Sequence, residues 1–336
     1  MQSAPQCTKW CLTYSQPWAI KCAFLKCGGC NVCVSRSSAP QRRCPVDSVR
    51  EPTLTMCCRK DGLGAQYMAL LSVYAFATFT NRTFCASPFV ELAHYTKHGR
   101  AVALDSWDLY NFVGGPSFGP IAAPTTPMKY SAVPELLRHA APDATPYHQL
   151  AGLARQFYDA ASNKPALRHF QRGRYNVVLH LRAGNVGPGG NGYAVRALSN
   201  RSRWIPRDKV TSCVRAVMQR APQNAVLHVF SQGTLSEFGF LAQWKPVLHI
   251  EAPREAAIVR ADSAGVTHTV KSIFHHMVEA DALITARSSL SLAAAFLSRG
   301  RVFSADLSCS AAGRCVSTDP TEHLVDAIMW RLESCS

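Results

Sequence analysis

The stretch YNVVLHLRAGNVG, residues 175–187, decides the fold of this chain. Its first part is a short run rich in valine and leucine, which predicts a buried strand. The run ends at Arg182, and a loop punctuated by glycines follows. Apolar strands alternate with amphipathic helices both before and after this stretch, so the sequence predicts an α/β fold with parallel strands.

The same patterns place the other elements. A strand, helix, strand unit is expected at residues 53–58, 65–79 and 83–87, with a right-handed crossover. Residues 111–146 are rich in glycine, proline and alanine and are expected to form loop, before a helix at 148–161. Later strands are expected at 176–182, 225–231, 247–251, 281–285 and 301–305, and helices at 207–220, 270–280 and 289–298. Two successive α/β halves follow, with a ligand crevice at the carboxyl ends of the strands.

Composition narrows the class of partner. The chain has 336 residues, of which 47% are apolar, enough for a substantial core. The net charge of +15 favours a phosphate-bearing or polyanionic partner, although a basic surface without a specific partner is the alternative. No helix-turn-helix, zinc-finger or RNP motif is present, so nucleic acid is not expected as the partner.

Cysteine is concentrated at the start of the chain. Nine of the 14 cysteines lie within residues 7–58, which predicts a small cysteine-rich module at residues 1–45. The spacing of Cys27, Cys30 and Cys33 also fits a metal site, but the lack of histidine or a second paired knuckle favours disulfides. The cysteine content predicts an oxidising compartment, and together with the family resemblance given below it implies the lumen of the Golgi or endoplasmic reticulum. No leader or apolar membrane span is evident, so membrane association is expected only through a leader outside this chain.

Three loops follow predicted strands, and each contains residue types that are suited to binding a phosphate group. In RKDGLGAQY, residues 59–67, Gly62 and Gly64 allow backbone amides to approach an anion at a helix start. A tight turn is the alternative for these glycines. Asp61 is the best candidate for a general base, and a turn-forming aspartate is the alternative.

The second and third loops add cationic and hydroxyl groups. Arg182 follows a buried strand and could hold a diphosphate with two parallel hydrogen bonds, while Gly184 keeps the loop open. His180 fits a ligand contact and a buried structural histidine equally well. In residues 280–298, Ser288 and Ser289 begin an alanine-rich helix. Serines at a helix start can help to bind an anion, and ordinary capping of the helix is the alternative.

Taken in this order, the three loops resemble the GDP-fucose-dependent fucosyltransferase superfamily, and most closely the protein O-fucosyltransferases. GLGAQYMALLSVYAF resembles the family's N-terminal glycine helix, LHLRAGNV its His-x-Arg-x-Gly peptide, and the Ser-Ser helix its phosphate-binding motif. VLHVFSQG resembles the piece between them. The resemblance covers about residues 54–324 and leaves the cysteine-rich module aside.

The resemblance implies a GT-B-like fold, in which two Rossmann-type domains, residues 46–165 and 166–336, face a cleft. It implies an inverting glycosyltransferase that moves a sugar, fucose, from a GDP-sugar to a glycan or glycoprotein, with no metal or other cofactor. Arg182 would promote departure of the diphosphate, and Asp61 is the candidate base. The implied donor-binding residues are Gly62, Gly64, Gln66, His180, Gly184, Asn185, Ser231, Ser288 and Ser289.

Two positions depart from the family pattern. Ala65 stands where many members have asparagine, and Asn185 stands where the motif has an acidic residue. These departures support a second hypothesis, a non-catalytic protein that binds carbohydrate or a partner on a degenerate glycosyltransferase scaffold. A third hypothesis is polyanion binding through the net charge.

Overall fold

A computed structural model describes residues 54–57, 62–90, 92–95, 101–119, 126–129, 145–181, 205–232, 235–251, 263–305, 307–309, 315–317 and 332–335. The expected cysteine-rich module lies outside the described residues. Among the candidate site residues, the same holds for Asp61, Arg182, Gly184 and Asn185.

A parallel sheet of six strands forms the centre of the described structure, in the order β12-β9-β8-β5-β6-β7. The strands are β5 (Tyr175–His180), β6 (Ala225–Gln232), β7 (Val247–Glu251), β8 (Ala282–Thr285), β9 (Arg301–Ser304) and β12 (Leu332–Ser334). The five expected strands and their parallel pairing are confirmed. The sequence analysis missed β12, whose three residues, LES, carry no strand pattern of their own.

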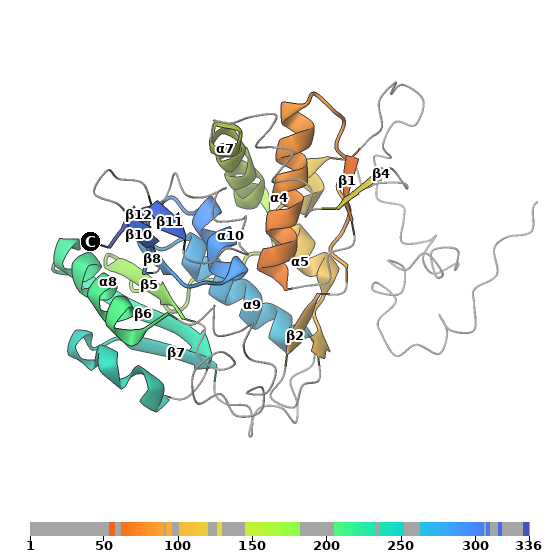
Figure 1. The fold of residues 1–336 in the computed structure, drawn as a ribbon. Coiled ribbons are helices and arrows are strands. Elements are labelled where there is room, and N and C mark those ends of the chain that lie inside the picture. The colour runs from red at the N-terminus through yellow and green to blue at the C-terminus, as the bar shows by residue number, and fades with distance from the viewer. Residues whose placement is uncertain are drawn as a thin grey trace, which may run out of the picture.

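Helices cover both faces of this sheet (Figure 1). Helix α8 (Arg207–Arg220) and the 3₁₀ segment η4 (Leu235–Trp244) lie on one face. Helices α9 (Ser263–Val278) and α10 (Ser289–Leu297) lie on the other. The expected bounds of α8 are confirmed, whereas α9 begins seven residues earlier than the expected helix at 270–280.

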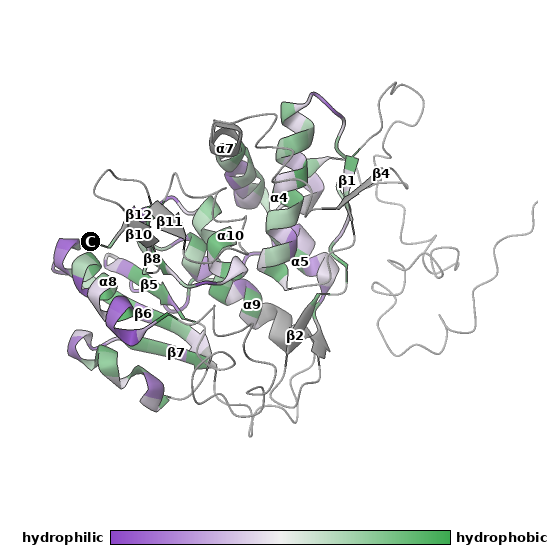
Figure 2. Ribbon diagram, in the orientation of Figure 1, coloured by the Kyte–Doolittle hydropathy of each residue, from purple (hydrophilic) through white to green (hydrophobic). Residues whose placement is uncertain are grey.

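The alternating direction of side chains along the strands explains why a separate apolar core lies on each face of the sheet. Val178, Phe230 and Leu283 belong to the core under α9 and α10. Their strand neighbours belong to the core under α8, because successive side chains point to opposite faces. Those neighbours are Val177, Leu179, Val229, Ala282 and Ile284. Figure 2 shows the result as green apolar stretches on the strands and α10, against purple hydrophilic stretches on α8.

The N-terminal part packs on the α9 and α10 side. Helix α4 (Leu63–Phe79) is apolar around most of its circumference and contacts both α10 and α7 (Thr145–Ala160). A helix of this kind is buried. The other elements here are β1 (Leu54–Cys57), β2 (Ala93–Tyr95), β3 (Ala101–Ala103), α5 (Ser106–Phe112), η1 (Gly115–Phe118) and β4 (Thr126–Lys129).

Two expectations for this part were wrong. Residues 83–87 do not form a continuous strand; they hold isolated bridge residues at Phe84 and Ala86, and Phe84 pairs in parallel with Leu54. Residues 111–146 are not all loop, because β4 pairs in parallel with β1. The sequence TPMK has a proline and no alternation, so its strand depends on pairing with β1 rather than on local preference. The C-terminal hairpin of β10 (Leu307–Cys309) and β11 (Cys315–Ser317) was also not foreseen.

One apolar core joins the N-terminal part to the sheet. It runs from Leu54 to Leu332 and so includes residues on both sides of the expected domain boundary at 165/166. Ion pairs cross the same boundary: Arg155 of α7 contacts Glu279, and Lys271 of α9 contacts Asp108. The α/β class is therefore confirmed, while two domains facing a cleft stay a prediction.

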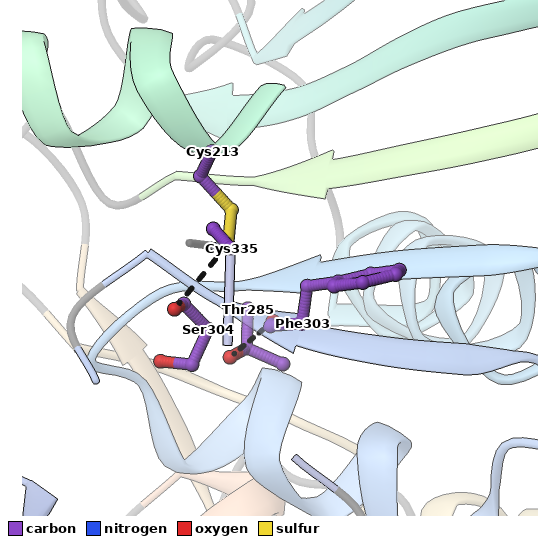
Figure 3. Close-up of a disulfide and its surroundings, with 5 residues drawn as sticks. All are labelled: Cys213, Thr285, Phe303, Ser304 and Cys335. Carbon is purple, nitrogen blue, oxygen red and sulfur yellow. Dashed lines mark hydrogen bonds between the residues drawn. A yellow bond between two sulfur atoms is a disulfide. The ribbon is translucent and has the colours of Figure 1, made fainter. Parts of the chain in front are cut away.

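A disulfide fixes the C-terminal edge strand. Cys213 of α8 is bonded to Cys335, the residue after β12, as Figure 3 shows beside Ser304. Cys85 is also disulfide-bonded. Such bonds form in oxidising compartments, as the cysteine content predicts. None of the helices in the described ranges combines the length and apolar content that crossing a bilayer requires.

Candidate functional site

The strand order defines where a ligand is expected. From β5 the chain moves outward through β6 and β7, and it then returns to the other side of β5 to add β8 and β9. The order therefore reverses between β5 and β8, and open α/β sheets bind ligands outside the strand ends at such a switch point. Leu181 follows β5 and Ala286 follows β8, so the second and third predicted loops leave the sheet side by side.

Helix α10 begins at this switch point. Ser288, its N-cap residue, is 6% exposed and extended, with φ −142° and ψ 125°, and its hydroxyl does not cap the helix. The Ser291 hydroxyl instead donates to the carbonyls of Ala286 and Ser288, at 3.2 and 3.1 Å, which fixes the turn. The first amides of α10, beginning with Ser289, thus lie at the sheet edge with the positive end of the helix dipole.

The glycine loop meets the start of α10 directly. A Cβ built on Gly64 would lie 2.3 Å from the Leu290 nitrogen and 2.4 Å from the carbonyl carbon of Ser289. Only glycine allows this approach of two backbones. Gly62, the N-cap of α4, has no described atom within 4 Å of such a Cβ. Two helix N-termini, distant in sequence, therefore converge beside the switch point, as Figure 1 shows for α4 and α10.

Gln66 has a structural contact that the sequence did not reveal. Its side-chain nitrogen donates to the Val90 carbonyl at 2.6 Å, and its side-chain oxygen accepts from the Val90 amide at 3.0 Å. The side chain is fully buried. This pair holds residues 88–90 against the first turns of α4. A role for Gln66 in donor binding stays a prediction.

The last two described candidates lie at the same sheet edge but on different faces. His180 ends β5, is 9% exposed, and shares the face of Val178 under α9 and α10. Ser231 lies on β6 next to Phe230, which is opposite His180 in register, so alternation places Ser231 on the α8 face. The structure therefore brings together Gly62, Gly64, Ser288 and Ser289, with His180 on the same side and Ser231 behind the sheet.

A histidine cluster on the β6 and β7 side was missed by the sequence analysis. His228 Nδ1 lies 3.1 Å from His249 Nε2, and its Nε2 lies 3.2 Å from the Asn176 side-chain oxygen. The Asn176 oxygen can only accept, so His228 Nε2 carries the proton and His228 Nδ1 accepts from His249. The ring of His169 packs on His249 and on His276. The alternation in VLHVF and VLHIE is the signal that could have placed two of these rings on one face.

Burial keeps the rings of His228, His249 and His276 neutral. Desolvation, with smaller effects from neighbouring histidines, lowers the pKa of His228 to about 4 and the pKa of His249 to about 3. The pKa of His276 is also lowered by burial, and its Nε2 accepts the backbone N–H of His169. Within the described ranges, no group of three or more histidine, cysteine or acidic side chains is arranged to hold a metal ion. The hydrogen bonds and ring contacts of His228, His249 and His276 therefore join β6, β7 and α9 through neutral side chains.

Comparisons with known proteins give structural likenesses only. No family model matches the chain, and no curated protein sequence matches it. The fucosyltransferase NodZ from Bradyrhizobium is similar in structure, with 12% identity, a TM-score of 0.37, and coverage of 81% of this chain and 99% of NodZ.

Two further likenesses are to other glycosyltransferases. Arabidopsis thaliana FUT1, solved as a mutant in complex with GDP, has 13% identity and a TM-score of 0.33 over 82% of this chain and 76% of its own. The E. coli ADP-heptose lipopolysaccharide heptosyltransferase II has 10% identity and a TM-score of 0.32, covering 76% and 84%. These TM-scores are below 0.5, so the function is argued from this chain's own residues.

Proposed function

We propose that this chain is an inverting, metal-independent glycosyltransferase that transfers fucose from GDP-fucose to a glycan or glycoprotein. The observation that carries the proposal is the convergence of the α4 and α10 N-termini beside the switch point between β5 and β8. The resemblance of all three loops to one superfamily supports the same assignment.

In this proposal the donor diphosphate lies at the two helix starts. The first amides of α10 donate to its oxygens, and Gly62, where a Cβ would meet no atom of the described residues within 4 Å, lets the phosphates approach the α4 backbone. Arg182 comes two residues after the end of β5 and supplies a fixed positive charge. Cationic groups and helix dipoles aimed at a departing diphosphate stabilise the charge that develops on it.

Transfer then requires an acceptor hydroxyl on the opposite side of the sugar carbon. Attack from that side forms the new glycosidic bond as the bond to the diphosphate breaks, so the anomeric configuration inverts. Asp61 directly precedes Gly62 and is the proposed general base that takes the hydroxyl proton. Asp61 precedes α4 in the chain and Arg182 follows β5, so the two proposed roles belong to two different loops.

The test is donor turnover by the full chain, measured as GDP release from GDP-fucose, GDP-mannose and UDP-sugars with a panel of glycan acceptors. Arg182→Ala is expected to lower turnover by about 100-fold or more without changing the melting temperature. Arg215→Ala, on the exposed face of α8, is the matched control and should behave as wild type. Undiminished turnover by Arg182→Ala would refute the role of this arginine. Absence of turnover with every donor would favour the non-catalytic carbohydrate-binding protein.

A further inference from the structure

The loop that leads into β5 presents three arginines to solvent. Arg168, Arg172 and Arg174 are all exposed. No carboxylate of the described residues forms an ion pair with any of them, whereas Arg155 and Arg301 each contact a glutamate. We call residues 168–174 the arginine loop.

The arginine loop is held in one shape by contacts on its inner side. The ring of Phe170 packs against His228 and His276, and the backbone amide of His169 donates to His276 at 3.3 Å. Gly173 has φ +75°, and its carbonyl accepts from the Asn224 side chain at 2.9 Å. A loop fixed in this way loses little further backbone entropy when it binds a ligand.

The neighbouring strand starts extend the positive charge. The N-terminal ends of β5, β6 and β7 lie side by side, so Arg174, the α8 end at Arg220 and Lys245 before β7 share one edge of the sheet. Arg220 and Lys245 are also exposed. Asp281 lies toward β8 and accepts the Asn176 amide at 2.7 Å. This basic edge is opposite the edge that holds the candidate active site, because the strands are parallel.

The chemistry of the loop selects the kind of polyanion. The ring of Phe170 packs against His228, and the ring of the exposed His169 packs on His249, so neither ring of the loop is left unpacked as a platform on which nucleic-acid bases could stack. The disulfides indicate an oxidising compartment, where acidic glycans rather than nucleic acids are the common polyanions. We propose that the arginine loop binds a sulfated or uronic-acid polysaccharide at a surface separate from the candidate active site. This inference does not depend on the proposed transferase activity.

The experiment uses heparin as the probe and the full chain, with affinity measured over a series of salt concentrations. The triple variant R168A, R172A and R174A is expected to bind heparin at least about 10-fold more weakly at 0.15 M salt, with a salt dependence reduced by about two to three ion contacts. The control R207A, K209A and R215A removes the same charge from exposed positions of α8 and should lose less than about threefold.

Each alternative outcome is distinguishable. Equal losses in both triple variants would show that net charge alone binds heparin and would overturn the proposal. Failure of the wild-type chain to bind heparin would do the same, as would tighter binding to single-stranded DNA or to phosphatidylserine vesicles. Replacing the three arginines with lysine keeps the charge and should retain most of the affinity. Unchanged melting temperatures would confirm that the variants are folded.

Discussion

Replacing Gly64 with alanine adds one methyl group where α4 and α10 touch. The new Cβ would lie 2.3 Å from the Leu290 nitrogen and 2.4 Å from two neighbouring backbone atoms, whereas ordinary contacts begin near 3.4 Å. The two helix starts must therefore separate by about 1 Å, since backbone atoms cannot rotate away as a side chain can.

The free energy of unfolding should fall despite a favourable helix propensity. Alanine in place of a helical glycine stabilises by about 1 kcal/mol, but overpacking of this kind costs about 3 kcal/mol. The expected net loss for Gly64→Ala is about 2 kcal/mol, which for a chain of this length is a fall in melting temperature of about 3 °C. Affinity for GDP should fall at least about 10-fold, because the helix amides no longer converge.

Gly62→Ala is the matched control for the stability part of this prediction. Its Cβ meets no described atom within 4 Å, so its stability should change by less than about 1 kcal/mol. Urea unfolding gives the stability of each variant, and a GDP titration gives the affinity. A Gly64→Ala variant that is as stable as wild type and binds GDP equally well would refute the close contact between α4 and α10. It would also refute the proposed diphosphate site, which depends on that contact.

Acid should destabilise the fold through the neutral histidine cluster. The pKa values of His228 and His249 in the folded chain, about 4 and about 3, lie below the unfolded value of 6.5, so stability is lost as pH falls below about 6.5. By pH 5, fully buried His228 should lower the free energy of unfolding by up to about 2 kcal/mol, and partly exposed His249 should lower it by less. In His228→Gln, the free energy of unfolding measured with urea should depend less on pH. An unchanged pH dependence would contradict this explanation. Replacing both Cys213 and Cys335 with serine should lower the free energy of unfolding by up to about 4 kcal/mol, because the disulfide closes a loop of 122 residues. Calorimetry of the two proteins, with and without a reductant, tests this. Equal melting temperatures of the variant and the wild type would count against it. Arg155→Met should destabilise by about 2 kcal/mol, because Glu279 and the Leu297 carbonyl lose this partner while Asp159 keeps Arg299; a salt-independent loss would argue for packing instead.

Local patterns were sufficient to predict five of the six sheet strands and the presence of α8, α9 and α10, although α9 begins earlier than expected. The strands β5 to β9 are apolar runs bounded by turn residues, and α8 has a polar and an apolar face, so each carries its own signal. The strand at β4 and the edge strand β12 could not be foreseen, because they form by pairing with β1 and β9. Long-range partners of this kind leave no trace in local sequence.

The sequence predicted individual residues of the candidate site but not which of them lie close together in the fold. Glycines and serines at helix starts were visible in the sequence, yet the contact of Gly64 with Leu290 joins residues that are far apart in the chain. The switch point also required the strand order, which loops alone do not reveal. Ser231 was expected near the donor, but pairing with β5 places it on the face away from His180.

The most direct test of the central claim is nucleotide binding by the folded chain. A thermal-shift panel of GDP, GDP-fucose, GDP-mannose, UDP and UDP-sugars, with and without EDTA, measures it without knowledge of the acceptor. A ligand at 100 times its Kd stabilises the folded state by about 2.7 kcal/mol, which is a readily measured shift. The account predicts that GDP and GDP-fucose raise the melting temperature equally with and without EDTA. No response to any nucleotide, or a response only to UDP compounds, would contradict it.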